Sequence, residues 1–272
     1  MPFTVSHAAA VLPLVKRGPL VGAALVAGSM APDVPFFLES LLPGSYRFGG
    51  LAHRPWAVPT VDVAIAAGLV GVWHGLVREP LVSLLPPEQA DRAEALTGLG
   101  KPSLRPADAV WFAASAAAGA ATHLGWDSFT HHGRAGVRLL PALERRVAGV
   151  AVHDILQYGT SLVGLGLLAA YSRRELAQAV PAARRREPSR RERRAALAGI
   201  GAATAAGAVH RVARETRGAR RADATGAARG RRRMPLGSLV ASVCFGAGAG
   251  TTVGAAGYAA VVRRARAAAG RS

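Results

Sequence analysis

Histidines and aspartates in the first half of this 272-residue chain occupy positions that could bind a metal ion. His123 and Asp127 are four residues apart in an apolar stretch, so on a helix an imidazole and a carboxylate would share one face. Zn²⁺ binds both ligand types. Further candidates precede this pair, namely His7, Asp33 and His53. Because ionisable side chains are costly among long apolar segments, these residues together favour a metal site, with zinc as the expected divalent ion.

Each candidate also has an ordinary structural explanation. A lone histidine near a helix end is more often a cap or an interface residue than a ligand. Arg54 and Arg134 could pair with the aspartates, since buried charges need partners. His131 and His132 directly follow the HxxxD pair and could lie in a solvated loop.

Apolar segments must position these residues, and four are close to the length of about 20 residues that a transmembrane helix needs. They are Val58–Val77, Ala109–Trp126, Ile155–Tyr171 and Leu236–Val262. His7–Val15 and Pro19–Ala31 are shorter and predict a helical hairpin, whereas Ala195–Val209 is a weak candidate. The sequence therefore predicts an all-α, polytopic membrane protein with about 4–6 transmembrane helices plus the short N-terminal hairpin. A soluble helical bundle is the alternative.

The net charge of +18 is distributed very unevenly along the chain. Residues 172–272 hold 22 arginines and 5 acidic residues, mostly in two runs with few large apolar side chains. We interpret these runs as loops that contact anionic lipid headgroups. They lack interleaved aromatic residues and any recognisable module, so no specific nucleic-acid partner is expected.

These observations predict the following organisation. Residues 1–171 form a motif-bearing helical membrane domain, followed by an Arg-rich loop at 172–194, a weak apolar helix at 195–209, a second Arg-rich loop at 210–235, a transmembrane helix at 236–262 and a basic tail at 263–272. In the last helix, Gly246, Gly250 and Gly254 are four residues apart, which predicts a ridge for close helix packing. With 32 glycines in the chain, this spacing could also arise by chance.

If successive segments cross the membrane alternately, every candidate ligand falls on the same side. The opposite side then carries 19 Lys/Arg, and the side of the candidate ligands carries 15. If residues 195–209 do not cross, the two counts become 24 and 10. By the positive-inside rule, the candidate site faces outward from the cell membrane. The more lopsided count favours a non-crossing 195–209 segment. No positive charge precedes His7, so we expect no cleavable signal peptide.

Three motifs carry a family resemblance: MPFTVSHAAAVLPL at the start of the chain, GSMAPD at residues 28–33 and HLGWDSFTH at residues 123–131. They resemble domain-of-unknown-function family 4184, best over residues 1–171, a family without an established activity. The pattern is also similar to membrane proteins assigned as metal-dependent hydrolases. That similarity implies a ligand set of His7, Asp33, His53, His123 and Asp127.

The order of these motifs more distantly resembles the zinc-dependent phospholipase C and single-strand nuclease superfamily. There, an HxxxE pair would follow, but here the residues are His153 and Gln157. The neutral glutamine departs from the pattern, so the resemblance implies one or two metals rather than three.

The leading hypothesis is a membrane metal-dependent hydrolase acting on a phosphoester or lipid-linked substrate. His131 would be a sixth ligand or a general base, and Arg54 would hold an anionic group of the substrate. The alternative is a non-enzymatic membrane protein whose polar cluster is structural or holds a structural ion. A transporter ranks last, because no inverted repeat is visible.

Overall fold

The computed structural model describes residues 3–98, 105–182, 187–224 and 236–269. Across these ranges the chain is almost entirely helical, and its strands are a short antiparallel hairpin of β1 (Arg146–Val147) and β2 (Val150–Ala151). The all-α prediction is confirmed at this level.

The N-terminal segment forms the predicted helical hairpin. The 3₁₀ turns η1 (Thr4–His7) and η2 (Leu12–Leu14) flank α1 (Ala8–Val11), which packs against α2 (Gly22–Met30). The connection turns through Lys16 at φ +68° and Gly18 at φ +53°, a backbone region that side chains rarely adopt.

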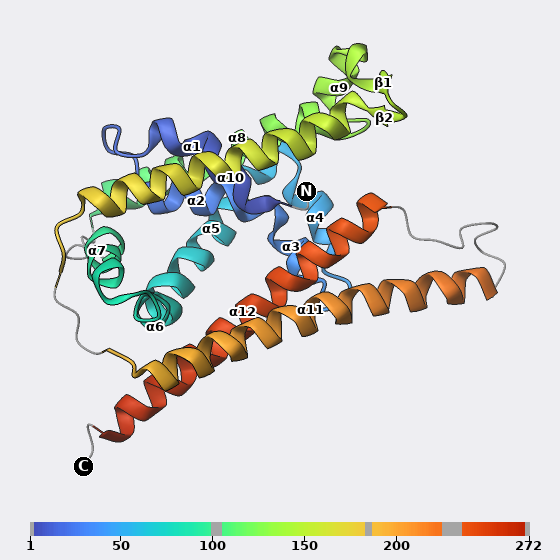
Figure 1. Ribbon diagram of the computed structural model, residues 1–272. Helices are drawn as coiled ribbons and strands as arrows, with labels where there is room; N and C mark the ends of the chain where they lie inside the picture. The colour runs from blue at the N-terminus through green and yellow to red at the C-terminus, as the bar shows by residue number, and fades with distance from the viewer. Residues whose placement is uncertain (1–2, 99–104, 183–186, 225–235, 270–272) are drawn as a thin grey trace.

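Of the elements that follow, α5, α8 and α10 pack against this hairpin (Figure 1). In chain order they are η3 (Ala31–Asp33), α3 (Val34–Leu38), α4 (Tyr46–Ala52), η4 (Pro55–Ala57), α5 (Val61–Val72), the π-helical η5 (Trp73–Val77), α6 (Arg78–Val82), α7 (Pro87–Thr97), α8 (Pro106–Thr130), α9 (Ala135–Leu139), η6 (Pro141–Glu144) and α10 (Val152–Gln178). Pro32 and Pro35 restrict the backbone on both sides of Asp33, where α2 is followed by the 3₁₀ turn η3 and then by the short helix α3.

Helices α2 and α8 pack in backbone contact at two glycines. A Cβ atom on Gly28 would lie 2.1 Å from the carbonyl oxygen of Ala116, and one on Gly119 would lie 2.2 Å from that of Leu25. Small residues allow such approach between helices whose own surfaces are apolar. The same small-residue core includes Ala66 of α5, so α2, α5 and α8 meet around it.

Within the described ranges, three helical stretches are long and apolar enough to cross a membrane. They are Val61–Val82, Val152–Gln178 and Leu236–Ala268. The predicted span Ala109–Trp126 lies inside α8 but is not among the three. Its inner face carries Ser115, Gly119 and His123 in place of large apolar residues, which lowers its hydropathy.

The C-terminal region is a pair of long helices, α11 (Arg190–Ala224) and α12 (Leu236–Ala269). Figure 1 shows the start of α11 beside the end of α12, with the two helices diverging toward their other ends. Gly246 of α12 meets Gly207 of α11, Gly250 meets Ala203, and Gly254 meets Ile200, so the two helices are antiparallel. The predicted glycine ridge is therefore the packing surface of α12, with α11 as its partner.

Arg211 anchors this helix pair to the N-terminal part of the chain. Its side chain is buried, and its Nε donates to Glu215 Oε1 at 2.5 Å. Its Nη1 donates to the carbonyl oxygen of Phe36 and to Ser40 Oγ, both at 3.2 Å. Ser242 of α12 donates to the other oxygen of Glu215, which ties α11, α12 and the α3 region together.

The predicted loops in this region are wrong over much of their length. Within 172–194, α10 continues to Gln178 and α11 begins at Arg190. Within 210–235, α11 continues to Ala224, and the tail predicted from 263 is helical to Ala269. Arginine and alanine are both good helix formers, so charge alone does not indicate a loop. Residues 183–186, 225–235 and 270–272 lie outside the described residues.

The antiparallel pairing also bears on the charge count. Helix α11 contains the end of the first arginine run and the start of the second, so these parts of the two runs lie at opposite ends of the helix. The start of α11 packs beside the end of α12. The arrangement with 24 basic residues on one side required both runs at the same end. The outward orientation of the site, which rests on the positive-inside rule, stays a prediction.

Candidate metal centre

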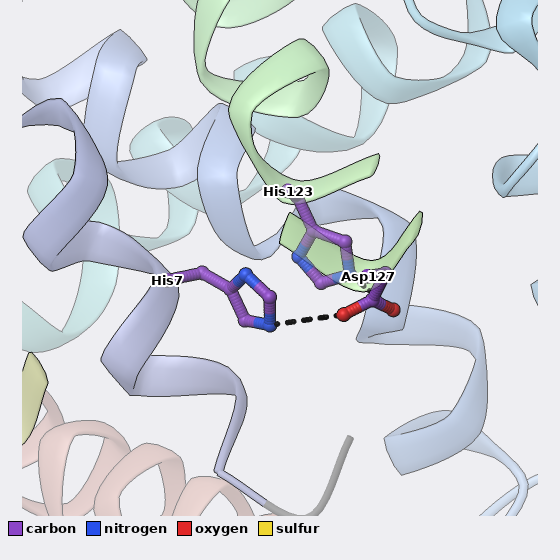
Figure 2. Close-up of side chains that lie close together, drawn as sticks. All are labelled: His7, His123 and Asp127. Carbon is purple, nitrogen blue, oxygen red and sulfur yellow. Dashed lines mark ion pairs between the residues drawn. The ribbon is translucent and has the colours of Figure 1, made fainter. Parts of the chain in front are cut away.

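All five predicted ligands converge inside the protein. His7 comes from η1, Asp33 from η3, and His53 directly follows α4, whereas His123 and Asp127 lie one turn apart on α8. Each is buried, with at most 6% of its surface exposed. Figure 2 shows the His7 imidazole beside that of His123, with the Asp127 carboxylate facing a His7 nitrogen.

The distances between these groups are those of ligands around an ion. Asp33 Oδ1 lies 3.6 Å from both His53 Nε2 and His123 Nε2. Asp127 Oδ2 lies 3.6 Å from His53 Nε2 and 3.5 Å from His123 Nε2, while Asp127 Oδ1 lies 3.5 Å from His7 Nε2. Hydrogen bonds to nitrogen are shorter, about 2.7–3.2 Å. Ligands held about 2.0–2.1 Å from a tetrahedral Zn²⁺ are about 3.3–3.4 Å apart, close to the observed spacing.

Several of these ligand atoms have no hydrogen-bond partner among the described residues. They are His7 Nδ1 and Nε2, Asp33 Oδ1, His123 Nε2 and Asp127 Oδ1. Buried polar atoms are normally satisfied, because leaving one unpaired costs about 1–3 kcal/mol, and more for a charged group. Unpaired atoms that face a common point fit a metal ion.

Neighbouring groups orient the ligands and leave their inward atoms free. Nδ1 of His123 lies 2.8 Å from the Ser29 carbonyl oxygen, and Nδ1 of His53 lies 2.8 Å from that of Gly49. Because a carbonyl only accepts, each Nδ1 donates, so Nε2 is the nitrogen of each ring that faces the cluster. Thr4 Oγ1 donates to Asp33 Oδ2, which leaves Oδ1 facing the cluster. Metal-binding histidines and carboxylates have such supporting hydrogen bonds.

Burial also prepares two imidazoles for metal binding. Loss of solvent, reinforced by the neighbouring His123, lowers the pKa of His7 from 6.5 to about 3. Burial likewise lowers the pKa of His131, although the Asp127 carboxylate opposes this effect. Both rings therefore favour the neutral form, the form that coordinates a metal.

The arginines that could have explained the aspartates structurally are not at the cluster. Arg54 and Arg134 are exposed. Among the ion pairs of the described residues, Asp33 and Asp127 pair with histidines and not with arginine. Arg54, which was predicted to hold an anionic group of the substrate, follows His53 in the chain. Among the described residues, its guanidinium has no hydrogen bond or ion pair with the ligands.

The histidines that follow Asp127 separate into different environments. His131 Nδ1 lies 3.6 Å from Asp127 Oδ1, and 26% of its side chain is exposed, so it forms the open edge of the cluster. His132 is exposed and lies 3.7 Å from Glu144, outside the cluster. His153, a weaker candidate, lies beside Asp154 at 3.2 Å.

Sequence reasoning missed the supporting groups. The Ser29 and Gly49 carbonyls carry no side-chain signal, and Thr4 lies in an ordinary apolar context. Asp62 is the fourth omission: it is fully buried on α5, and neither carboxylate oxygen has a hydrogen-bond partner among the described residues. Its position at the start of an apolar helix, nine residues after His53, was the available signal.

Comparison with known proteins identifies a family but no characterised relative. No curated protein and no solved structure matches this chain. The family model described as "Domain of unknown function (DUF4184)" matches residues 1–258 and so includes both the metal-ligand cluster and most of the C-terminal helix pair. With nearly its whole length matched, the chain belongs to the DUF4184 family.

Proposed function

We propose that this protein is an integral membrane, metal-dependent hydrolase that acts on a phosphoester or lipid-linked substrate at the outer face of the cell membrane. One observation carries the proposal: buried imidazole and carboxylate atoms that have no hydrogen-bond partner in the described parts of the chain face one another at ligand-to-ligand distances. His7, Asp33, His53, His123 and Asp127 would hold the ion, which we expect to be Zn²⁺ because two carboxylates and three imidazoles suit it.

A divalent ion held here would lower the pKa of a water molecule toward neutrality and polarise a phosphoryl or acyl group. The chain's own residues would do the rest. The Ser29 and Gly49 carbonyls keep His123 and His53 in the tautomer that binds, and Thr4 fixes the Asp33 carboxylate. His131 lies at the exposed edge, where substrate would enter and where an imidazole could bind the ion or accept a proton.

The segments that flank the ligands in the chain support a lipid-linked substrate. They combine exposed large apolar residues with arginines, a composition suited to the boundary between acyl chains and headgroups. The apolar residues include Leu41, Leu42, Trp56, Leu139, Leu140 and Val147, and the arginines are Arg47, Arg54, Arg134, Arg138, Arg145 and Arg146. A phosphate held at this boundary would lie near the open edge of the cluster, and Arg54 is the arginine next to a ligand.

The test is to purify the full chain in detergent and measure bound metal and hydrolysis together. Bis-p-nitrophenyl phosphate and a short-chain phosphatidylcholine serve as soluble and lipid probes. We expect bound zinc, and hydrolysis that chelation abolishes and added Zn²⁺ restores. Absence of bound metal after incubation with Zn²⁺ would exclude the metal centre. Tight metal binding without hydrolysis of either probe would favour the second candidate, a non-enzymatic membrane protein with a structural ion, which the near-complete burial of the ligands also fits.

A reporter fused after Asp127 tests the orientation. We expect it to report the outer side of the membrane, and a cytoplasmic result would overturn that part of the proposal.

A further inference from the structure

The connection between α8 and α10 exposes large aliphatic side chains. Leu139 is 76% exposed, Leu140 52%, Val147 58% and Val150 46%. We propose that this connection, residues 134–151, is a membrane-binding surface: its aliphatic side chains insert among the lipids beside α10, and its arginines hold the phosphates of anionic phospholipids. The inference rests on the membrane location that is part of the proposed function, and it requires neither hydrolysis nor a bound metal.

The tip of the β1–β2 hairpin is apolar and preformed. Val147 and Val150 are partners in the strand register, so their side chains lie on the same face of the hairpin. Ala148 and Gly149 between them have φ values of +50° and +81°, as a tight two-residue hairpin turn requires. Arg146 Nη1 donates to the Gly149 carbonyl oxygen at 2.6 Å, which holds the turn from its base. The tip therefore offers an apolar surface in a fixed turn, and a fixed turn lowers the entropic cost of binding.

The connection is anchored to the ends of both long helices. Gly136 and Val137 are buried, and a Cβ atom on Gly136 would lie 2.6 Å from the Phe129 ring of α8. The backbone N–H of Val152, the first residue of α10, donates to the Arg145 carbonyl oxygen at 2.9 Å. Figure 1 shows α9 and the hairpin at the end of α10 that is farthest from α7. Since α10 is apolar enough to cross a membrane, a crossing α10 would hold the hairpin at the bilayer surface.

The arginines of the connection are available for anionic groups. The connection contains four arginines and one acidic residue, Glu144. Arg134, Arg138 and Arg145 are exposed, and their guanidinium groups have no hydrogen bond or ion pair among the described residues. Arginine binds phosphate through paired N–H donors, and basic residues next to a membrane are attracted to anionic lipids. Apolar side chains flanked by arginines are therefore suited to the headgroup region of a bilayer.

A protein partner is the competing occupant of this surface. The cores of protein–protein interfaces are enriched in aromatic residues, and their strongest contacts are often Trp or Tyr. Residues 134–151 contain no aromatic residue, and their exposed large apolar side chains are all aliphatic. A phospholipid offers acyl chains to the aliphatic tip and a phosphate to the arginines, so a bilayer matches both features of the surface.

The membrane-binding surface adjoins the open edge of the ligand cluster. Helix α9 packs against α8, and His131 directly follows the last residue of α8. His132 lies 3.7 Å from Glu144 of the connection. Lipids held by this surface would therefore meet the cluster at the edge where His131 is exposed, which deepens the proposal of a lipid-linked substrate.

The accessibility of a fluorescent label in a bilayer tests the insertion. In the full chain, Cys244→Ala removes the one cysteine, and Val147→Cys or Leu139→Cys supplies a new one for labelling with the fluorophore NBD. The protein is reconstituted into nanodiscs of phosphatidylcholine with or without phosphatidylglycerol. We expect quenching by lipids that carry a spin label near the headgroup end of the acyl chain. Quenching by aqueous iodide should be several-fold weaker than for the control Glu88→Cys, whose side chain is exposed on the polar helix α7.

Labels at both positions that iodide quenches as strongly as the control, and that the spin-labelled lipids do not quench, would overturn the proposal. The surface would then be free for a protein partner. Insertion in a protein that binds no metal would exclude the proposed metal centre and leave this surface standing. An exposed tip in a protein that binds metal would do the reverse.

The arginines are tested with the label at Val147→Cys. Phosphatidylglycerol should increase quenching by the spin-labelled lipids, and Arg138→Gln combined with Arg145→Gln should remove that increase. Arg173→Gln combined with Arg174→Gln is the matched control, because these arginines are exposed toward the other end of α10, and it should keep the increase. No increase in the parent protein, or an increase that survives the loss of Arg138 and Arg145, would overturn the assignment of phosphates to these arginines.

Discussion

The ligand cluster and the Arg211 network are two buried polar groupings among the described residues, and they differ in how their atoms are satisfied. At Arg211, the guanidinium, the Glu215 carboxylate and the hydroxyls of Ser40 and Ser242 all have partners. At the cluster, His7 Nε2, Asp33 Oδ1, His123 Nε2 and Asp127 Oδ1 have none among the described residues. A satisfied buried network holds helices together, whereas buried polar atoms without partners call for an explanation such as a bound ion. The proposed metal centre accounts for this difference.

The largest expected effect comes from removing the Asp127 carboxylate, whose oxygens lie 3.5–3.6 Å from nitrogens of His7, His53 and His123. Asp127→Ala should abolish Zn²⁺ binding, because every other ligand atom discussed above lies near this carboxylate or beside a ligand that does. Zn²⁺ should raise the unfolding temperature of the native protein and leave that of the variant unchanged, since a ligand stabilises only a folded state that binds it. Isothermal titration calorimetry and thermal unfolding in detergent measure the two quantities. A Zn²⁺-dependent rise in the unfolding temperature of Asp127→Ala would show that this carboxylate is not a ligand.

Arg211→Met tests the opposite side of the comparison. Breaking a buried, hydrogen-bonded pair leaves Glu215 uncompensated and should lower stability by about 3 kcal/mol. Metal stoichiometry should stay the same, because Arg211 contacts the α3 region and not the ligands. The control is Arg217→Met, an exposed arginine of the same helix that bonds only to the Ala213 carbonyl. Equal destabilisation by both variants would contradict a special role for Arg211.

A matched pair of glycine substitutions sharpens the comparison further. Gly119→Ala would place a Cβ 2.2 Å from the Leu25 carbonyl oxygen, and Gly250→Ala would place one 2.1 Å from that of Ala203. Each overpacked contact should cost about 1–3 kcal/mol. Only Gly119→Ala should also weaken Zn²⁺ binding, because shifting α2 against α8 moves the Ser29 carbonyl away from His123. Equal metal affinity in the two variants would show that this carbonyl does not tune the ligand.

The smallest effect is expected from Thr4→Val, which removes a supporting hydrogen bond and keeps the shape of the side chain. Loss of the donor to Asp33 Oδ2 should weaken metal binding about 10- to 100-fold without removing a ligand. Thr122→Val is the control, since its hydroxyl bonds only to the Gly119 carbonyl of its own helix. A competition assay with a zinc-binding dye measures both affinities, and an unchanged value for Thr4→Val would remove Thr4 from the site.

The sequence was informative wherever residue type and spacing act locally. The HxxxD spacing put His123 and Asp127 on one helix face, and alternating segments brought His7, Asp33 and His53 to the same end of the molecule. The glycine repeat of Gly246, Gly250 and Gly254 likewise predicted a packing face. These inferences follow from helical periodicity and from the order of the segments.

What the sequence could not supply depends on tertiary contacts. The arginine runs were interpreted as loops because charge is usually solvated, yet Arg211 is buried by helices that meet it from distant parts of the chain. The carbonyl partners of His53 and His123 are backbone atoms, which any residue offers. The burial of Asp62 could be predicted only by knowing which face of α5 packs against η3 and α8. For residues 109–126, the sequence also did not distinguish a segment apolar enough to cross a membrane from one that is apolar but below that level.

Helix α11 has a consequence for how the protein is assembled. It is not one of the three helices apolar enough to cross a membrane unaided, yet it lies antiparallel along α12 through a seam of small residues. Because α11 is synthesised before α12, it lacks this packing partner until α12 has been made. Its placement beside α12 therefore has to wait until α12 has been made. A truncated protein that ends before residue 236 should leave α11 unsupported and open to proteolysis, so the placement of α11 depends on a helix that is synthesised after it.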